Sequence, residues 1–462
     1  MKIKAIIIGA GKLGHRLAEL MDKEEIHVTL LDLNQEKLER INNHLDVLTV
    51  VGDGLEISTL KELEIEDYDL LIATTSTDES NTLICSLAKK LGVKQTIARI
   101  RNPEYAEQLP FLKNEMGIDH IVNPDLATAI EIERYLLKRY NFHTGDFAKG
   151  KVSIFDFNIA TLNTFVGKAL MDLENFDGFL IAAISREGRL IIPSGLTELK
   201  EYDILHIIGK SKDVKKLAKE LKVDKKKRIP NRVMILGGGK IGHYLAQRLE
   251  RYDVNTIIIE KNRERSQYLA EKLAKTLIIH GDGTNLDILE EENLKTMDAF
   301  VGLTDLDEQN LLMALVAKES GIDKSIAKIS RPNYVQVIDK LDLDVAFNPV
   351  DITASDILKF IRGGRVLSVS LLLGGEGEVT EIIAEKDSPI VGKPLHEINL
   401  PKGIIIGAVL HEGKVFIPDG ESVIHENDRM VIFSLASDLG NLKDLLQLKE
   451  KGGLFSGLWN DR

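Results

Sequence analysis

One glycine-rich pattern occurs twice in the chain, and this repeat constrains the fold more than any other feature. Both copies have the spacing G-x-G-x-x-G, at residues 9–14 and 237–242. An acidic residue follows the last glycine by 18 positions in each copy, Asp32 in the first and Glu260 in the second. This spacing is typical of a strand, tight turn and helix that hold a dinucleotide by its pyrophosphate. Two such units predict two nucleotide-binding domains.

Further matches extend the repeat along almost the whole chain. Residues 52–54 recur at 281–283, Asn123-Pro124 recurs as Asn348-Pro349, and residues 166–168 recur at 391–393. Each half therefore has two parts, an N-lobe and a C-lobe. The boundaries that we expect are 1–142 and 143–222 for the first lobes, 223–230 for a linker, 231–361 and 362–448 for the second lobes, and 449–462 for a tail.

Apolar strands alternate with amphipathic helices in the first part of each half. The expected strands of the first half are residues 4–8, 27–31, 47–51, 70–74, 95–99 and 120–122, with helices at 13–21 and 81–91 among them. Strands this apolar are typical of a parallel sheet that is buried on both faces. The pattern predicts an α/β protein with two Rossmann-type doubly wound parallel-sheet domains.

The second part of each half is shorter and rich in β signals. Hairpins are expected at residues 179–192 and 404–417, and helices at 213–221 and 436–446 end the two parts. Each Rossmann-type domain is thus expected to be followed by a small α+β C-lobe.

Composition excludes several classes of protein. The 462 residues favour about three domains, and the net charge of −12 argues against a general nucleic-acid binder. No apolar run approaches the roughly 20 residues that span a bilayer. The only cysteine, Cys85, cannot form an internal disulfide. We therefore expect a cytoplasmic protein.

The residues expected to bind nucleotide lie in the two glycine loops and at the carboxyl ends of the strands. Asp32 and Glu260 would accept hydrogen bonds from ribose hydroxyls and repel a 2′-phosphate, which favours NAD(H) over NADP(H). The expected set is Gly9, Ala10, Gly11, Lys12, Leu13, Gly14, Asp32, Asp53, Thr74, Thr75 and Arg99 in the first half, and Gly237, Gly239, Lys240, Ile241, Gly242, Glu260, Asp282, Thr304 and Lys328 in the second.

The basic residues differ between the two sites. Arg99 ends the fifth strand and would hold a phosphate with two donors, whereas its counterpart is Lys328. Arg101, which would also hold a phosphate in the first half, corresponds to Ser330 in the second. The sequence therefore predicts two sites of unequal affinity.

Some of these positions also fit plainer roles. Asp53 and Asp282 each stand between two glycines, where they would contact adenine or only stabilise a turn. His15 and His243 would contact a phosphate, a neighbouring subunit or neither. Cys85 lies among apolar residues and is expected to be a small core residue, not a nucleophile.

No pattern predicts a catalytic or metal site. The acids Asp78-Glu79 would bind a divalent ion or simply begin a helix, and no Cys/His spacing is typical of zinc. His206 has no histidine at the corresponding position, and the two halves share no Ser/His or Tyr/Lys pair. We predict neither a catalytic residue nor a bound metal.

Two segments outside the lobes have open roles. Residues 223–230 carry a basic run, which is a solvated linker or a patch for anionic lipid. The glycine-rich tail contains the only tryptophan, Trp459, and is a disordered end or a docking peptide.

The order of motifs resembles the TrkA family, cytosolic regulators of Trk potassium uptake built from tandem domains that regulate potassium conductance. The matching residues are 9–14 with Asp32, 52–53, 78–81 and 99–105, and the resemblance covers nearly the whole chain. It implies that the protein binds NAD(H), with ATP or ADP as further candidates, and that it is no enzyme. It also implies a homo-oligomeric gating ring, dimer or tetramer, at the inner face of the membrane beneath a TrkH-like subunit. Some relatives of the C-lobe bind cyclic di-AMP, which nothing in these residues indicates.

Two other functions remain open, an NAD-dependent oxidoreductase and a regulator of a different transporter or channel. For the assembly, residues 125–140 and 351–361 are helix candidates with apolar positions on more than one face. We expect these helices to pack against another lobe or subunit. Charged substitutions at Ile130 and Leu137 should then dissociate the oligomer.

Overall fold

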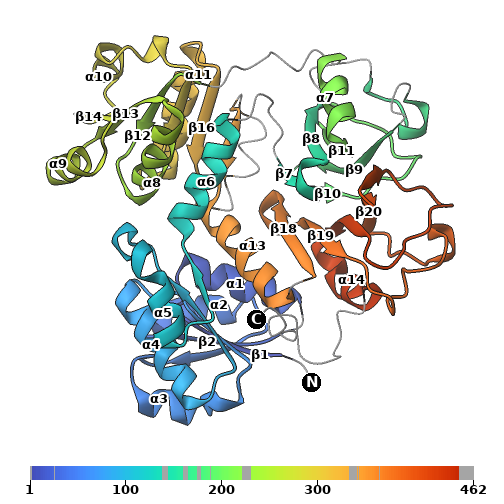
Figure 1. Ribbon diagram of the computed structural model, residues 1–462, viewed down its shortest axis with the longest axis horizontal. Helices are drawn as coiled ribbons and strands as arrows, with labels where there is room; N and C mark the ends of the chain where they lie inside the picture. The colour runs from blue at the N-terminus through green and yellow to red at the C-terminus, as the bar shows by residue number, and fades with distance from the viewer. Residues whose placement is uncertain are drawn as a thin grey trace. The chain divides into compact units, whose positions relative to one another are not determined.

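The computed structural model (Figure 1) describes residues 3–24, 26–137, 144–159, 165–173, 178–187, 189–220, 230–331, 334, 341, 343–363 and 365–446. They form two compact units, and each unit draws on both halves of the chain. The first contains Met1–Glu133, Pro230–Ser330 and Ala346–Ile357, and the second contains Arg134–Ile229, Arg331–Val345 and Leu358–Arg462. The expected tail lies outside the described residues, as does the linker except for Pro230.

Two six-stranded parallel sheets make up the first unit. The first sheet has the order β3-β2-β1-β4-β5-β6, and the second has the matching order β14-β13-β12-β15-β16-β17. The strands of the first sheet are β1 (Lys4–Ile8), β2 (His27–Asp32), β3 (Leu48–Val51), β4 (Leu70–Ala73), β5 (Gln95–Arg99) and β6 (His120–Val122). Those of the second sheet are β12 (Arg232–Leu236), β13 (Asn255–Glu260), β14 (Leu277–His280), β15 (Ala299–Gly302), β16 (Lys324–Lys328) and β17 (Val345–Phe347).

Helices connect these parallel strands. In the first N-lobe they are α1 (Lys12–Lys23), α2 (Gln35–Asn42), α3 (Ile57–Glu62), α4 (Asp78–Leu91), α5 (Leu109–Met116) and α6 (Pro124–Leu137). In the second they are α8 (Lys240–Leu249), α9 (Arg263–Lys272), α10 (Leu286–Glu291), α11 (Asp307–Glu319) and α13 (Pro349–Arg362). The prediction of two doubly wound domains is confirmed.

The central strands form because their residues are apolar on both faces. Ile6 and Ile7 of β1 are fully buried, as are Leu71 and Ile72 of the neighbouring strand β4. Helices on both faces of a parallel sheet require this composition, since neither face meets water. The strand order also places β1 and β4 side by side, so their carboxyl ends form the crevice where ligands of this fold bind.

Two five-stranded sheets make up the second unit, with the matching orders β10-β9-β11-β8-β7 and β18-β19-β22-β20-β21. The elements are β7 (Thr144–Phe147), β8 (Val152–Asn158), β9 (Phe179–Arg186), β10 (Arg189–Ile191), β11 (Ile204–Lys210) and α7 (Ser211–Glu220), then β18 (Val366–Leu372), β19 (Gly377–Ile383), β20 (Ile404–His411), β21 (Lys414–Phe416), β22 (Arg429–Leu435) and α14 (Leu439–Leu445). Both predicted hairpins are present, and their pairing is antiparallel.

The two C-lobes share one hydrophobic core. Phe147 and Ile154 of the first lobe belong to the same buried cluster as Val379 and Phe433 of the second. Neither sheet alone buries its apolar face, which explains why the duplicated C-lobes form one unit.

The helices α6 and α13, which were expected to pack against another lobe or subunit, each contact the other N-lobe of the same chain. Asn123, which precedes α6, donates from Nδ2 to the Tyr244 hydroxyl of α8 at 3.0 Å, and Glu133 of α6 pairs with Arg248 of α8. Ile130 is half-buried. Whether this face also joins subunits stays a prediction. Among the described residues, no helix is both long enough and apolar enough to cross a membrane.

Candidate functional site

The first glycine loop needs glycine at its two ends. Gly9 has a φ of +108°, and a Cβ there would lie 2.9 Å from the carbonyl carbon of Thr74. A Cβ on Gly14 would lie 1.9 Å from the carbonyl oxygen of Gly9. By contrast, at Gly11 a Cβ would meet no atom of the described residues within 4 Å. The outer glycines therefore serve the turn, whereas Gly11 leaves open space where a ligand can approach the N-terminus of α1.

The second loop repeats this arrangement. Gly237 has a φ of +103° and would bring a Cβ to 2.9 Å from Leu303, while a Cβ on Gly242 would lie 2.3 Å from the Gly237 oxygen. Gly239, like Gly11, has open space within the described structure. Both loops therefore have the shape that a pyrophosphate requires.

The acids that end the second strand of each half, Asp32 of β2 and Glu260 of β13, hold the glycine loops in place. Asp32 accepts a hydrogen bond from the Ala10 N–H at 2.6 Å through one oxygen and from the Asn34 N–H at 2.8 Å through the other. Glu260 accepts at 2.7 Å from the Gly238 N–H. A carboxylate oxygen keeps a further lone pair, so each acid can also accept from a ribose hydroxyl.

A cavity of about 400 Å³ lies at the carboxyl ends of the first parallel strands. Its volume falls in the range of small-molecule sites, roughly 300–1,000 Å³. The predicted residues that line it are Gly9, Gly11, Asp32, Asp53, Thr74, Thr75 and Arg99. Ala10, Lys12, Leu13 and Gly14 stand outside this lining, and of these Leu13 and Gly14 are buried in α1.

The corresponding cavity in the second N-lobe is smaller, about 190 Å³. The predicted residues that line it are Gly237, Gly239, Glu260, Asp282 and Thr304. Lys240, Ile241, Gly242 and Lys328 stand outside its lining. The difference in volume agrees with the expectation that the two sites are unequal.

Arg265, which was not predicted from the sequence, is hydrogen-bonded to the second glycine loop. Its Nε donates to the Gly238 carbonyl at 2.7 Å, and its guanidinium carbon lies 4.6 Å from the centre of the Tyr268 ring. The corresponding position in the first half is Lys37, which lines the first cavity. Arg265 stands outside the lining of the second cavity, so it holds the glycine loop and is not one of the groups that face the site.

Asp53 and Asp282, which each stand between two glycines, line their cavities and also form turns. Asp53 accepts from the Leu55 N–H at 2.9 Å, and Asp282 accepts from the Thr284 N–H at 3.1 Å. A hydrogen bond from Lys261 lowers the pKa of Asp282 to about 2. Turn chemistry is therefore present, and a further contact with adenine stays a prediction.

Asn81 holds two residues that line the first cavity, Thr75 and Arg99. Its Oδ1 accepts from the Thr75 N–H at 2.8 Å and from the Thr75 hydroxyl at 2.7 Å, while its Nδ2 donates to the Arg99 carbonyl at 2.9 Å. Asn310 makes the same contacts with Thr304 and Lys328 in the second half. In the sequence this asparagine is recognisable only as part of the motif at residues 78–81, whereas in the structure it joins the ends of β4 and β5 to α4.

Arg99 is the basic group at the first cavity. Its guanidinium donates to the Thr75 carbonyl, and its buried Nε has no hydrogen-bond partner among the described residues. Burial and the neighbouring Arg101 lower the pKa of Arg99. A bound phosphate would provide both the missing acceptor and a compensating charge. Burial also lowers the pKa of Lys328, which is 9% exposed.

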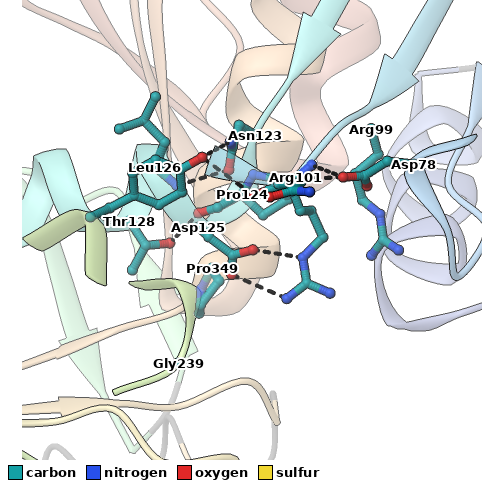
Figure 2. A network of polar contacts seen from close by, with 12 residues as sticks. Asp78, Arg99, Arg101, Asn123, Pro124, Asp125, Leu126, Thr128, Gly239 and Pro349 are labelled. Atoms are coloured by element: carbon teal, nitrogen blue, oxygen red, sulfur yellow. Dashed lines mark hydrogen bonds and ion pairs between the residues drawn. The ribbon is translucent and has the colours of Figure 1, made fainter. Parts of the chain in front are cut away.

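Arg101 has a different role from the one expected, since it does not reach into the cavity. Its Nε donates to Asp125 at 2.6 Å, at the start of α6, as Figure 2 shows. The Arg101 N–H donates to Asp78 at 2.9 Å. The pair with Asp125 raises the pKa of Arg101 and engages its Nε and one of its two Nη atoms. The interpretation of Arg101 as a phosphate ligand is therefore replaced by that of a link between β5 and α6.

Polar contacts join the two N-lobes beside the first site. The Tyr244 hydroxyl donates to the Arg101 carbonyl at 3.3 Å, and Arg16 of α1 donates to Asp351 of α13 at 2.9 Å. Burial raises the pKa of Tyr244 to about 12, so the hydroxyl keeps its proton near neutrality. Both fingerprint helices, α1 and α8, thus contact residues of the other half.

The remaining single residues follow the plainer expectations. His15 is exposed, whereas His243 is 4% exposed and its ring lies 5.8 Å from that of Tyr268. Burial lowers the pKa of His243, which keeps its ring neutral near pH 7. Cys85 is fully buried, and burial raises the pKa of its thiol.

A hydrogen-bonded Ser–His–Asp chain in the first C-lobe was also missed. The Ser185 hydroxyl lies 2.7 Å from His206 Nε2, and His206 Nδ1 lies 2.7 Å from Asp156. The three residues stand on the adjacent strands β9, β11 and β8, and Ser185 is 4% exposed. A hydroxyl so buried is not open to a substrate, so the chain is best explained as a polar tie across the sheet.

Comparison with known protein families agrees with this architecture in both halves. The TrkA-N domain family matches residues 5–124 and 233–349. The TrkA-C domain family matches residues 154–222 and 379–447. The TrkA-N ranges cover the two parallel sheets, and the TrkA-C ranges cover the two antiparallel sheets except β7, β18 and the first residues of β8 and β19.

Similar proteins have nearly the same length. Trk system potassium uptake protein TrkA homolog 2 of Methanosarcina mazei is 34% identical over 96% of this chain and 100% of that protein. Trk system potassium uptake protein TrkA of Vibrio alginolyticus is 34% identical over 93% and 95% of the two chains. The protein of that name in Haemophilus influenzae is 33% identical over 98% and 100%.

Solved structures share the fold. The GsuK channel superimposes with a TM-score of 0.55 at 19% identity, over 97% of this chain and 79% of the channel. The structure of the GsuK channel bound to NAD gives a TM-score of 0.54 at 18% identity, over 97% of this chain and 80% of that one. At such identities the likeness is one of fold.

Proposed function

This chain belongs to the TrkA family, and from that premise we propose that it is a nucleotide-sensing regulatory subunit of a Trk-type potassium uptake system. The observation that carries the proposal is the first cavity, where an open glycine loop, an acid and an arginine converge. We propose NAD(H) as its ligand, with ATP or ADP as competitors for the same site.

Each part of a dinucleotide has a matching group in the cavity. The N-terminus of α1 beside Gly11 favours the pyrophosphate, and Asp32 accepts from the adenine ribose. Arg99 neutralises a phosphate, which also relieves the cost of its own burial. The smaller volume of the second cavity supports weaker binding there.

Binding in one lobe would be communicated through the contacts between the two N-lobes. A ligand shifts a protein between states only by binding them with different affinity. Arg99 lies two residues before Arg101, which holds both Asp125 and, through its carbonyl, Tyr244. Movement of β5 on phosphate binding would therefore reach α6 and α8. We propose that a membrane subunit of TrkH type receives this change from a homo-oligomeric ring of the protein.

Isothermal titration of nucleotide-free protein tests the binding step. We expect NADH to bind with higher affinity than NADPH, because the 2′-phosphate would meet Asp32. ADP and ATP should compete with NADH. Equal affinity for NADH and NADPH, or no binding of either, would contradict the proposed site.

A further inference from the structure

Three potential metal ligands meet at one end of the second C-lobe. His411 ends β20, while His425 and Asp428 stand on the turn that leads into β22. A ligand atom from each of the three residues lies within 4.8 Å of the other two. His411 Nδ1 is 2.6 Å from one Asp428 oxygen, and His425 Nδ1 is 3.7 Å from the other.

The turn itself is held rigidly. The His425 N–H donates to Asp428 at 2.8 Å, and the Asp428 N–H donates back to the His425 carbonyl at 3.1 Å. The Asp428 side chain is only 3% exposed, whereas those of His411 and His425 are 38% and 57% exposed. A buried carboxylate thus anchors a site whose two imidazoles remain open to solvent.

The first C-lobe has the same turn with different chemistry. There the Lys200 N–H donates to Asp203 at 2.8 Å, as the His425 N–H does to Asp428. Arg186, which corresponds to His411, donates to both oxygens of Asp203 at 2.8 and 2.7 Å. The first copy therefore neutralises its carboxylate with a fixed guanidinium, and the second copy replaces both cationic residues by imidazoles, which can act as metal ligands.

We propose that His411, His425 and Asp428 form a binding site for a divalent transition metal of the Zn²⁺ class. Two imidazole nitrogens and one carboxylate oxygen suit zinc, which binds such donors at about 2.0–2.2 Å in a tetrahedron. Calcium and magnesium prefer oxygen donors and fit this set poorly. Three protein ligands leave the fourth position to water or to an exogenous anion.

Closing the site requires small side-chain rotations. To share one ion, the more distant donors have to approach, whereas His411 Nδ1 and the Asp428 oxygen, 2.6 Å apart in their hydrogen bond, have to separate slightly. Rotation of the two solvent-exposed imidazoles allows both changes. Zinc would take the place of the proton between His411 Nδ1 and Asp428, and that proton would move to the other ring nitrogen, Nε2. Lys210, Glu412 and Lys414 line the cavity next to His411, and the two lysine charges outweigh the single carboxylate and oppose a dication. We therefore expect a metal that chelators remove readily.

The duplication supplies a matched set of variants. His411→Arg restores the residue found at this place in the first copy, so the lobe should fold with an Arg–Asp428 pair in place of a metal site. Arg186→His combined with Lys200→His should create a second site on Asp203. His425→Ala removes an exposed ligand without affecting the core.

Calorimetric titration of chelator-treated full-length protein with ZnCl₂ tests the site, with circular dichroism as the check on folding. Wild type should bind one equivalent that His411→Arg and His425→Ala lose or bind at least about tenfold more weakly. The double variant of the first copy should gain one equivalent. Absence of zinc binding by wild type, or unchanged binding in the folded His411→Arg and His425→Ala proteins, would overturn the proposal. If His411→Arg does not fold, the His425→Ala result alone decides.

Discussion

Replacing Gly11 by valine should strongly weaken nucleotide binding at the first site while leaving the fold intact. Gly11 caps α1 with φ −74° and ψ −173°, an extended conformation that any residue adopts. Its Cβ would meet no atom of the described residues within 4 Å. The valine side chain would instead occupy the space next to the free N–H groups of α1.

The expected loss follows from the contacts that the valine blocks. A hydrogen bond to a charged group contributes about 1.5–3 kcal/mol. Excluding the pyrophosphate from one such N–H should weaken NADH binding by about 10- to 150-fold, because each 1.4 kcal/mol is a factor of ten. The folded state should lose about 1 kcal/mol or less, since glycine is a better helix cap than valine.

Gly239→Val is the matched variant in the second site, where φ is −60° and ψ is −167°. Titration of NADH into the two variants and wild type, with thermal unfolding as the control, measures both effects. The stronger binding event should weaken by this factor in Gly11→Val and keep its affinity in Gly239→Val. A Gly11→Val protein that is folded and binds NADH like wild type would refute the placement of the pyrophosphate.

Three further outcomes follow from buried groups. Asn81→Ala should cost about 1–3 kcal/mol of unfolding free energy in denaturant titration and also weaken NADH binding, because it releases Thr75 and Arg99; unchanged values of both would contradict this role. Arg362→Met leaves the buried Glu378 carboxylate without its cationic partner and should cost about 3–5 kcal/mol of unfolding free energy. Adding Glu378→Leu should recover much of that loss. A double variant that loses as much as the two single variants together would contradict this explanation. The Cys85 thiol, whose pKa burial raises, should react with a disulfide reagent far more slowly in native than in denatured protein, and equal rates would show that it is accessible.

The N-lobes were predictable because local chemistry determines them. Strands such as β1 and β4 are apolar on both faces, and the glycines that begin α1 and α8 allow few other turns. The expected strands in the first half agree with the observed ones to within about one residue, which is ordinary for element boundaries.

The C-lobes were less predictable because their elements depend on pairing between distant segments. The hairpins β9–β10 and β20–β21 were recognised by their turns, whereas β8 and β11 have no local signal that marks them as neighbours. The chain Ser185, His206 and Asp156 arises only from that register. No spacing rule would have found it.

The same limit applied to individual site residues. Arg101 has the charge of a phosphate ligand, yet Asp125 holds it, and sequence separation conceals that contact. His411 and Asp428 became neighbours only when β20 and β22 were placed side by side. Comparison of the two halves offered a clue, since Arg186 and His411 occupy corresponding positions.

Potassium flux into liposomes that contain a TrkH-type membrane subunit tests the central proposal most directly. Flux would be measured with and without this protein, in the presence and absence of NADH, and with Gly11→Val and Gly239→Val beside wild type. The account predicts that the protein makes flux depend on NADH, that Gly11→Val removes this dependence, and that Gly239→Val has the smaller effect. The proposal would be contradicted by a potassium flux that changes neither with the protein nor with NADH. A Gly11→Val protein that responds to NADH as wild type does would also contradict it.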